Sequence, residues 1–591
     1  MMPRHLTVAV PALLAGFALL GALPRVAYAS SSAVHDVEDS NALIMTAEIA
    51  LQRDDCGRAA ANYTTAAQRL TDVKLAERAT GVALDCGQYQ AAERAAARWR
   101  QLTPTDPAAL RAAMRADLGQ YKIDDARSAF ESWINNGGGV VAPRAAHRDD
   151  PGKSGGSGSG ADENFAEQLG EVAQEAGVPA TLAMLRGVQV PRLQNGRAQL
   201  ELAGLAFDGW NYREALQYAQ HALSEGAERA PAQMLLARAH AGLGEAEQAV
   251  AAAGAARVAA PKDQSFAAAD VLMLLGRERE ARQAIESLRD NPGLRAQADR
   301  RLGLLAFERG DFDEAQNIFS GLLKDPESSG IAVYYLAAVA ERRGETETAL
   351  RGYQMLVGTG LESAARNRAA SILYKEGQRD QALQLLQAKD SASPATKLEA
   401  EIAQAQLLSN GGEGDRALAR IDDALARFPG HPDVLYQKAI LLEKAGRTSA
   451  AITQLEALYR ERPQDSSISN ALGFILADHN RDLSRAERLI NAALKSEPDN
   501  PAILDSLGWL DYRRGMQQAA LPLLERAFRL DQDGDIGAHW GEVLWALGDK
   551  AKARDTWNRA LLIDPDNALV KAAQQRAGVP SLPVQGTGTS I

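Results

Sequence analysis

An alanine recurs about every 34 residues through most of this sequence, and that period constrains the fold more than any other feature. Successive alanines stand 32 to 35 residues apart, at Ala215, Ala249, Ala281, Ala315, Ala349, Ala382, Ala417, Ala451, Ala486, Ala520 and Ala553. A small residue at a fixed phase lets two helices approach closely, and a repeat of this length is typical of stacked helical hairpins. The period therefore predicts a solenoid in which each hairpin packs on its neighbours.

Glycines and prolines keep the same phase and predict where each helix ends. Glycine reverses the chain five residues before the alanine in several repeats, at Gly310, Gly344, Gly446, Gly515 and Gly548. Proline stops the second helix twelve residues after it, at Pro261, Pro429, Pro463, Pro498 and Pro565. Aromatic residues make up only 5% of the chain, which also favours helix over sheet.

Phase and composition divide the chain into segments. The repeat is strong over about 205–577 and weaker near the N-terminus, where Ala59, Ala92 and Ala126 keep the spacing. We expect an N-terminal repeat block at 41–134, a flexible Gly/Ser-rich linker at 135–163, and a main repeat solenoid at 164–577. A degenerate hairpin is expected in 164–190, with its turn at 177–179. Residues 578–591 are expected to form a disordered tail.

The first 29 residues have the pattern of an export signal. A short polar start precedes the apolar run 6–23, and the sequence Ala27-Tyr28-Ala29 fits a cleavage site. Residues 30–40 would then be a short leader. The apolar run is also close to the length of a membrane span, so an uncleaved anchor is the alternative. The residue directly after the expected cleavage site is Ser30 and not the cysteine that a lipoprotein requires, which favours an unlipidated protein.

Cys56 and Cys86 are the only cysteines. Both fall near the turns inside the first two hairpins, which stacking brings into proximity. In an exported chain they would form a disulfide, while two separate buried thiols are the alternative.

The sequence carries no pattern typical of an enzyme. It has no phosphate-binding loop, nucleophile elbow or metalloprotease helix, and its eight histidines are scattered. We therefore expect no catalytic residues, no cofactor and no metal. The acidic loop of Asp531, Asp533, Asp535 and Glu542 partly matches a calcium loop, but Ile536 stands where glycine is required, so helix capping is the preferred interpretation. The net charge of -11 argues against a nucleic-acid partner.

Binding residues are expected on the first helices of the hairpins, which line the concave groove of a solenoid of this type. Groove positions lie about 8, 11 and 15 residues before each packing alanine. The candidates for partner binding are Trp509, Tyr512, Asp505, Trp545, Glu542, Phe474, Asn470, Tyr436, Tyr334 and Phe307. Aromatic side chains supply much of the energy of protein interfaces. The alternative is that several of these aromatics pack between adjacent repeats.

These repeats resemble the tetratricopeptide repeat family, most clearly in "LDSLGWLDYRRGMQQAALPLLERAFRLD" and "WGEVLWALGDKAKARDTWNRALLIDPDN". The resemblance implies an all-α, right-handed superhelical solenoid of about 14–15 helical hairpins that binds proteins.

A more specific resemblance lies in the order of the segments. The opening "ALIMTAEIALQRDDCGRAAANYTTAAQRL" and the closing "ALGFILADHNRDLSRAERLINAALKSEPDN" are similar to periplasmic lipoprotein adaptors of bacterial carboxyl-terminal processing proteases. This implies a scaffold that brings peptidoglycan hydrolases to such a serine protease in the periplasm. The missing lipid-attachment cysteine departs from that pattern. The alternative function is a scaffold for envelope assembly or polysaccharide export, which would bind a synthase or a porin.

Overall fold

The computed structural model describes residues 31–138, 159–389 and 391–579, and within these ranges the chain is helical with no strand. The early hairpins are α1 (Ser31–Gln52) with α2 (Cys56–Arg69), α3 (Val73–Asp85) with α4 (Tyr89–Leu102), α5 (Pro107–Gly119) with α6 (Ile123–Asn135), α7 (Ser159–Ala176) with α8 (Val178–Leu185), α9 (Gly196–Asp208) with α10 (Tyr212–Ser224), α11 (Arg229–Leu243) with α12 (Ala246–Ala259), α13 (Ala267–Leu274) with α14 (Glu278–Leu288), α15 (Arg295–Glu308) with α16 (Phe312–Leu322), α17 (Ser329–Arg342) with α18 (Thr346–Gln354), and α19 (Glu362–Lys375) with α20 (Arg379–Leu386).

The late hairpins are α21 (Pro394–Asn410) with α22 (Gly414–Arg427), α23 (Pro432–Lys444) with α24 (Thr448–Glu461), α25 (Ser466–Asp478) with α26 (Leu483–Ser496), α27 (Pro501–Arg513) with α28 (Gln517–Leu530), and α29 (Gly534–Ala546) with α30 (Lys550–Ile563). Helix α31 (Ala568–Arg576) covers the end of the stack, and a short 3-10 turn, η1 (Pro191–Gln194), precedes α9. The described residues thus form fifteen hairpins and one terminal helix, in agreement with the predicted all-α solenoid.

The periodic residues occupy the positions that the sequence predicted for them. Every alanine of the series from Ala215 to Ala553 is fully buried between the two helices of its hairpin. The five phased glycines all have positive φ, from +73° at Gly344 and Gly446 to +91° at Gly548. A side chain would strain that left-handed conformation, which explains glycine at the turn between the two helices.

The segment that joins the two repeat blocks lies mostly outside the described residues, but the hairpins on either side of it pack on one another. Phe130 and Trp133 of α6 share one hydrophobic core with Phe165 and Leu169 of α7, and the Trp133 and Phe165 rings are 6.3 Å apart. The hairpin expected over 164–190 is α7 and α8, which turn at Gly177 with φ +88°. The two repeat blocks therefore form one continuous stack. The expected export signal and nearly all of the expected C-terminal tail lie outside the described residues.

Cys56 and Cys86 form a disulfide that joins the first two hairpins, with their Cα atoms 5.5 Å apart. Cys56 begins α2 and Cys86 follows the end of α3. Of the two interpretations that the sequence left open, the structure shows the bonded one. Among the described residues, no helix combines the length and the apolar character needed to cross a bilayer.

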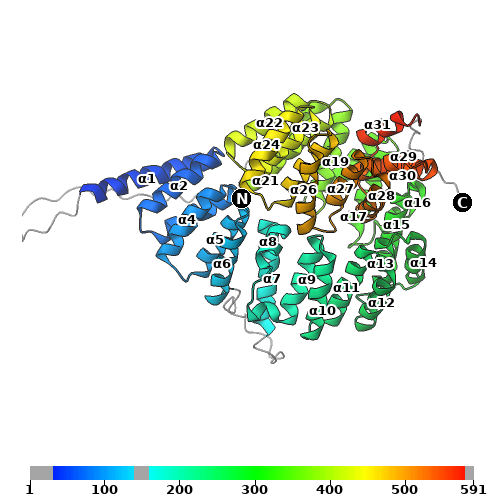
Figure 1. The fold of residues 1–591 in the computed structure, drawn as a ribbon, viewed down its shortest axis with the longest axis horizontal. Coiled ribbons are helices and arrows are strands. Elements are labelled where there is room, and N and C mark those ends of the chain that lie inside the picture. The colour runs from blue at the N-terminus through cyan, green and yellow to red at the C-terminus, as the bar shows by residue number, and fades with distance from the viewer. Residues whose placement is uncertain (1–30, 139–158, 390, 580–591) are drawn as a thin grey trace, which may run out of the picture.

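The solenoid coils until its late hairpins lie against its early ones (Figure 1). Turns inside the early hairpins α1–α20 meet connections between the late hairpins α21–α31, and we call this line of contacts the seam. The Gln88 amide donates to the Pro429 carbonyl at 2.9 Å, and the Asp499 carboxylate accepts the Tyr212 backbone N–H at 2.8 Å. The side chain of Lys397 lies 2.7 Å from the carboxylate of Asp54.

Two arginines carry much of the polar contact across the seam. Arg462 donates to the Gly119 carbonyl and lies over the Tyr121 ring, 5.6 Å from its centroid. Arg529 donates to the carbonyls of Ala241 at 3.1 Å and Gly242 at 3.2 Å. Carbonyl groups at the ends of helices lack donors within the helix, and these guanidinium groups bind to them there. The Ala241 carbonyl also accepts the Gly244 backbone N–H at 2.9 Å.

We predict that Arg462→Met together with Arg529→Met opens the seam without unfolding the hairpins. Loss of the charged hydrogen bonds should lower the free energy of unfolding by about 2–4 kcal/mol. The radius of gyration measured by X-ray scattering should rise, while helix content from circular dichroism stays constant. The control replaces Arg485 and Arg514 by Met, because both pair only with neighbouring repeats. An unchanged radius of gyration in the seam variant would contradict the prediction.

Candidate functional site

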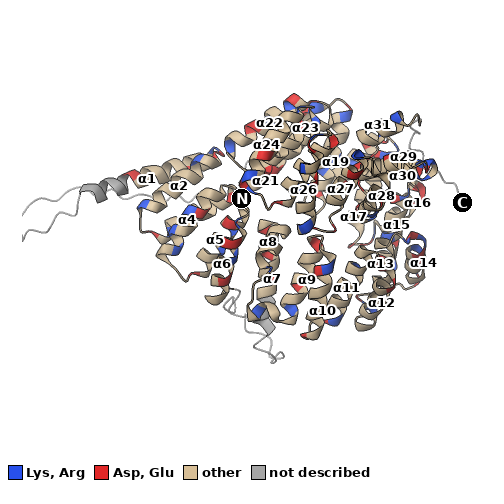
Figure 2. Ribbon diagram, in the orientation of Figure 1, with Lys and Arg blue, Asp and Glu red and all other residues tan. Residues whose placement is uncertain are grey.

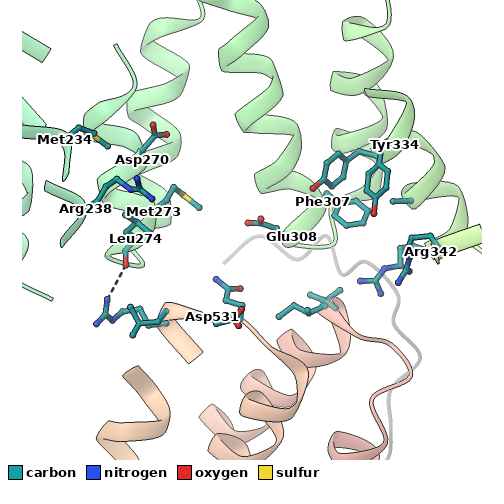
Figure 3. A pocket seen from close by; sticks show the side chains of 18 of the residues that line it. Met234, Arg238, Asp270, Met273, Leu274, Phe307, Glu308, Tyr334, Arg342 and Asp531 are labelled. Atoms are coloured by element: carbon teal, nitrogen blue, oxygen red, sulfur yellow. Dashed lines mark hydrogen bonds between the residues drawn. The ribbon is translucent and has the colours of Figure 1, made fainter. Parts of the chain in front are cut away.

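A cavity of 880 Å³ lies between the early and late hairpins (Figure 3). One wall comes from the first helices α11, α13, α15, α17 and α19, and the other from the ends of α28 and α30. Its lining residues include Met234, Arg238, Asp270, Met273, Phe307, Glu308, Tyr334, Tyr335, Arg342, Tyr353, Arg368, Arg529, Asp531, Leu562 and Ile563. We call this space the inter-turn cavity. Phe307 and Tyr334, two of the candidates that the repeat phase put forward, line this cavity.

Aromatic rings hold the wall of the inter-turn cavity in place. The Phe307 ring packs edge-on against Tyr335 at 5.3 Å, and the Tyr334 ring packs edge-on against Tyr353 at 5.5 Å. Tyr335 in turn stacks on Phe319 at 5.1 Å. Because these rings come from adjacent repeats, the wall is preorganised rather than assembled when a ligand arrives.

Two of the charged residues that line the inter-turn cavity, Arg368 and Asp270, are held in ion pairs. Arg368 makes two hydrogen bonds to the Glu341 carboxylate, at 2.6 and 3.1 Å, and the Tyr353 hydroxyl donates to the same carboxylate at 2.8 Å. Arg301 makes a paired contact with Asp270 at 2.9 and 3.2 Å. Burial raises the pKa of Glu308, and nearby Glu278 adds to that shift.

Arg342 has no such partner. Within the described part of the chain its guanidinium makes no hydrogen bond or ion pair, and its Nη1 atom is buried without a partner. Its charge lies over the faces of Phe307 and Phe312, 5.9 and 6.0 Å from the ring centroids. Burial lowers the pKa of this guanidinium, with a further contribution from the charge of Arg368.

A second cluster of predicted residues surrounds His539 in the last hairpins. The His539 Nδ1 atom lies 2.9 Å from Oδ1 of Asp505, and its ring stacks on Trp509 at 4.2 Å. The Trp509 indole N–H donates to the Asp478 carboxylate at 2.9 Å. Burial alone would lower the pKa of His539, but the Asp505 carboxylate outweighs it and raises that pKa above its usual value.

This cluster corrects the expectation that Trp509 and Asp505 are accessible in a groove. Trp509 is 5% exposed and Asp505 is 6% exposed, and both are occupied by contacts within the stack. The repeat places equivalent helix positions of successive hairpins opposite one another, so residues about one period apart meet, as Asp505 and His539 do. Both residues therefore pack between repeats, and for Trp509 this is the alternative that the sequence left open for the aromatic candidates.

The other candidates lie partly buried on the first helices. Tyr512 packs beside Trp509 at 5.1 Å, and Phe474 lies 5.8 Å from the His539 ring. Trp545 packs against Trp557 at 5.7 Å. Glu542 accepts a hydrogen bond from Arg576 at 2.6 Å.

Two further candidates lie on α23 and α25. Tyr436 lines a separate cavity of 440 Å³ that also includes Arg462 and Tyr121. The Asn470 side-chain oxygen is buried and has no hydrogen-bond partner in the described structure.

The acidic loop before α29 caps the N-terminus of that helix. The Asp533 carboxylate caps α29 by accepting the backbone N–H groups of Asp535 and Ile536, at 2.7 and 3.2 Å. Asp535 accepts a hydrogen bond from the Asn567 amide at 2.7 Å. In the described ranges no group of His, Cys, Asp and Glu side chains is arranged to hold a metal ion.

Sequence reasoning missed Arg342, Tyr335 and the late residues of the inter-turn cavity. Tyr335 and Arg342 stand one residue from the counted groove positions, so a wider window on the first helices would have included them. Arg529, Leu562 and Ile563 reach the cavity only because the solenoid coils back on itself. A repeat period by itself does not give the pitch of that coil, so no signal in the sequence pointed to them.

Comparison with known proteins identifies the type of repeat. Residues 266–315, 300–360 and 402–466 match the sequence model of the tetratricopeptide repeat family. The TPR repeat-containing protein PA4667 of Pseudomonas aeruginosa is 33% identical over 212 residues, which cover 36% of this chain and 36% of that protein. The cellulose synthase operon protein C of Xanthomonas axonopodis is 26% identical over 228 residues, 35% of this chain and 15% of that protein. The matches thus span little more than a third of the first relative and less of the second.

A solved structure of an APC/C hetero-tetramer, Cut9–Hcn1, aligns with 92% of this chain and 97% of its own, with 16% identity and a TM-score of 0.28. With the helical architecture described above, the family matches support a tetratricopeptide-type solenoid, a fold that generally serves as a protein-interaction scaffold.

The His539 cluster predicts a specific dependence of stability on pH. Because the folded-state pKa of His539 is raised above the unfolded value of 6.5, its contribution is fully present below about pH 6.5 and is lost as the pH rises through the folded-state pKa. The urea midpoint of the wild type should therefore fall, relative to that of His539→Gln, between pH 6 and pH 9. His221→Gln, at a surface histidine, is the control. If the urea midpoints of the wild type and His539→Gln changed in parallel with pH, the predicted contribution of His539 to stability would be contradicted.

Proposed function

We propose that this protein is a non-enzymatic scaffold of the bacterial cell envelope that brings peptidoglycan hydrolases to a periplasmic carboxyl-terminal processing protease. The observation that carries a binding role is the inter-turn cavity, whose aromatic wall contains Phe307, Tyr334 and Tyr335 and places the Arg342 guanidinium 5.9 Å from the centroid of the Phe307 ring. A wall of this composition suits a peptide, because aromatic and arginine side chains provide most of the energy in protein interfaces. The choice of protease and hydrolase rests on the resemblance of the first and last repeats to adaptors of such proteases.

Export to the periplasm is part of the proposal. The pattern of residues 1–29 favours it, and the disulfide between Cys56 and Cys86 suits an oxidising compartment. Because Ser30, and not a cysteine, stands directly after the expected cleavage site, we propose an unlipidated form.

The adaptor would act by holding protease and substrate together. Two partners bound to one frame meet at an effective concentration of roughly millimolar when the connection is short, and the frame needs no chemistry of its own. The repeat blocks share a core across residues 139–158, so we propose that both partners dock on one continuous frame rather than on two blocks that move apart.

A scaffold for envelope assembly or polysaccharide export is the second candidate. One observation favours it: residues of this chain are 26% identical to part of a cellulose synthase operon protein. That candidate would require a synthase or a porin as partner.

Reconstitution from purified components separates the two candidates. With protease and a cell-wall hydrolase at micromolar concentrations, the protein should raise the rate of hydrolase degradation roughly tenfold or more, and it should degrade nothing by itself. Phe307→Ala with Tyr334→Ala should reduce the acceleration, whereas Val258→Ala, at a side chain that is 79% exposed, should not. An equal degradation rate with and without the protein would rule out the adaptor and favour the assembly scaffold.

A further inference from the structure

The seam begins at the turns of the first two hairpins, on both sides of the disulfide that joins these hairpins. Gly57 follows the first cysteine, and a Cβ atom built there would lie 2.6 Å from Cγ of Pro429. Gly87 follows the second cysteine, and a Cβ atom there would lie 2.2 Å from the His431 ring. Both late residues belong to the connection between α22 and α23, where the first hairpins reach the late ones (Figure 1).

The late connection docks on a surface that the two turns form together. The Pro429 ring lies against Gly57 of the first hairpin, and the Pro429 carbonyl accepts the amide of Gln88 in the second hairpin at 2.9 Å. The turn of the first hairpin also binds Lys397 through the carboxylate of Asp54 at 2.7 Å. Neither turn provides this docking surface alone, so its shape depends on the distance between the two turns.

The disulfide fixes that distance from within the core that crosses the seam. Cys56 and Cys86 are each 1% exposed. They belong to the same hydrophobic core as Phe428, at the start of the late connection, and Val434 of α23. The bond therefore lies beneath the docking surface and not at its edge.

Reduction of this disulfide would disturb the docking surface. It replaces a covalent bond by the contact of two thiols, and non-bonded sulfur atoms need more room than bonded ones. The contacts beside the cysteines cannot take up the shift toward the late hairpins, because a single added carbon atom at Gly57 or Gly87 would already overlap them. The two turns can therefore yield only by moving away from the late hairpins.

The later contacts of the seam do not depend on the disulfide. Arg529 donates to the Ala241 carbonyl at 3.1 Å, and Lys375 pairs with Asp566. All four residues are far along the chain from both cysteines. Reduction should thus release helices α1–α4 from the late hairpins, while the rest of the coil stays closed.

We propose that the disulfide is a redox latch of the seam, and that the first two hairpins close onto the late hairpins only when Cys56 and Cys86 are bonded. Latching is an oxidation by thiol–disulfide exchange, in which the two thiols pass two electrons and two protons to the disulfide of an oxidant, which becomes a pair of thiols. Because both sulfur atoms are buried in the closed coil, the exchange takes place while the contact is open, and closure then shields the bond. This inference goes beyond the proposed function and does not depend on the identity of the partners.

Carbodiimide cross-linking of the full chain, analysed by mass spectrometry, tests the latch. The bond between Lys397 and Asp54 reports on the latched contact, and the bond between Lys375 and Asp566 reports on the rest of the coil. The wild type is compared in its oxidised form, after complete reduction and removal of the reductant under argon, and after reoxidation with oxidised glutathione. Reduction should lower the yield of the first bond roughly tenfold or more relative to the second, and reoxidation should restore it.

Cys56→Ala with Cys86→Ala should behave as the reduced wild type does. The matched control is Val82→Ala, which removes side-chain atoms from the same core and keeps the disulfide, and this variant should keep the cross-link between Lys397 and Asp54. Loss of that cross-link in Val82→Ala to the same extent would overturn the proposal, because packing and not the bond would then hold the contact.

Two results with the wild type alone would also overturn the latch. One is an equal yield of the cross-link between Lys397 and Asp54 in the oxidised and reduced forms. The other is the loss of both cross-links on reduction together with helix content measured by circular dichroism, because the first two hairpins would then not open by themselves. The wild-type comparison is decisive even if the alanine variants fail to fold.

Discussion

The close contact between the two helices of a hairpin, made at a fully buried alanine in fourteen of the fifteen described hairpins, is the constraint on which the rest of the structure depends. Such a contact fixes how two helices cross, and the repeat applies it again and again along the chain. The chain therefore coils regularly, and after about ten hairpins it meets its own earlier turns. A larger side chain in place of one of these alanines would push the two helices apart, and this would also change the pitch of the whole coil.

The seam turns that regular coil into a closed frame. Helix ends expose carbonyl groups that lack partners within the helix, and the opposite turn supplies Arg462 and Arg529 to them. Gly87 shows how tightly the turns meet, because a Cβ atom there would lie 2.2 Å from the His431 ring. Basic and acidic residues are interspersed over early and late hairpins alike (Figure 2), so local pairs rather than a field of one sign hold the turns together. The inter-turn cavity is a consequence of this closure.

The sequence was sufficient for everything that the repeat determines. The buried alanines, the glycines with positive φ and the turn at Gly177 follow from local phase, and two of the candidates that the same phase put forward, Phe307 and Tyr334, line the cavity. It failed for Trp509, because groove positions and inter-repeat contacts alternate within a few residues on one helix. The repeat phase could not predict the late wall of the cavity, because Leu562 comes to lie beside Gly310 only through the pitch of the coil. Contacts between residues so far apart depend on small angles summed over many repeats.

Zero-length cross-linking tests the closed coil most directly. A carbodiimide joins an amine to a carboxylate only where the two groups touch, and Lys397 lies 2.7 Å from Asp54, 343 residues away in the chain. Mass spectrometry of the monomer should find this bond, together with one between Lys375 and Asp566. Cross-links confined to neighbouring repeats, such as Lys552 with Glu525, would show an open solenoid and contradict the account.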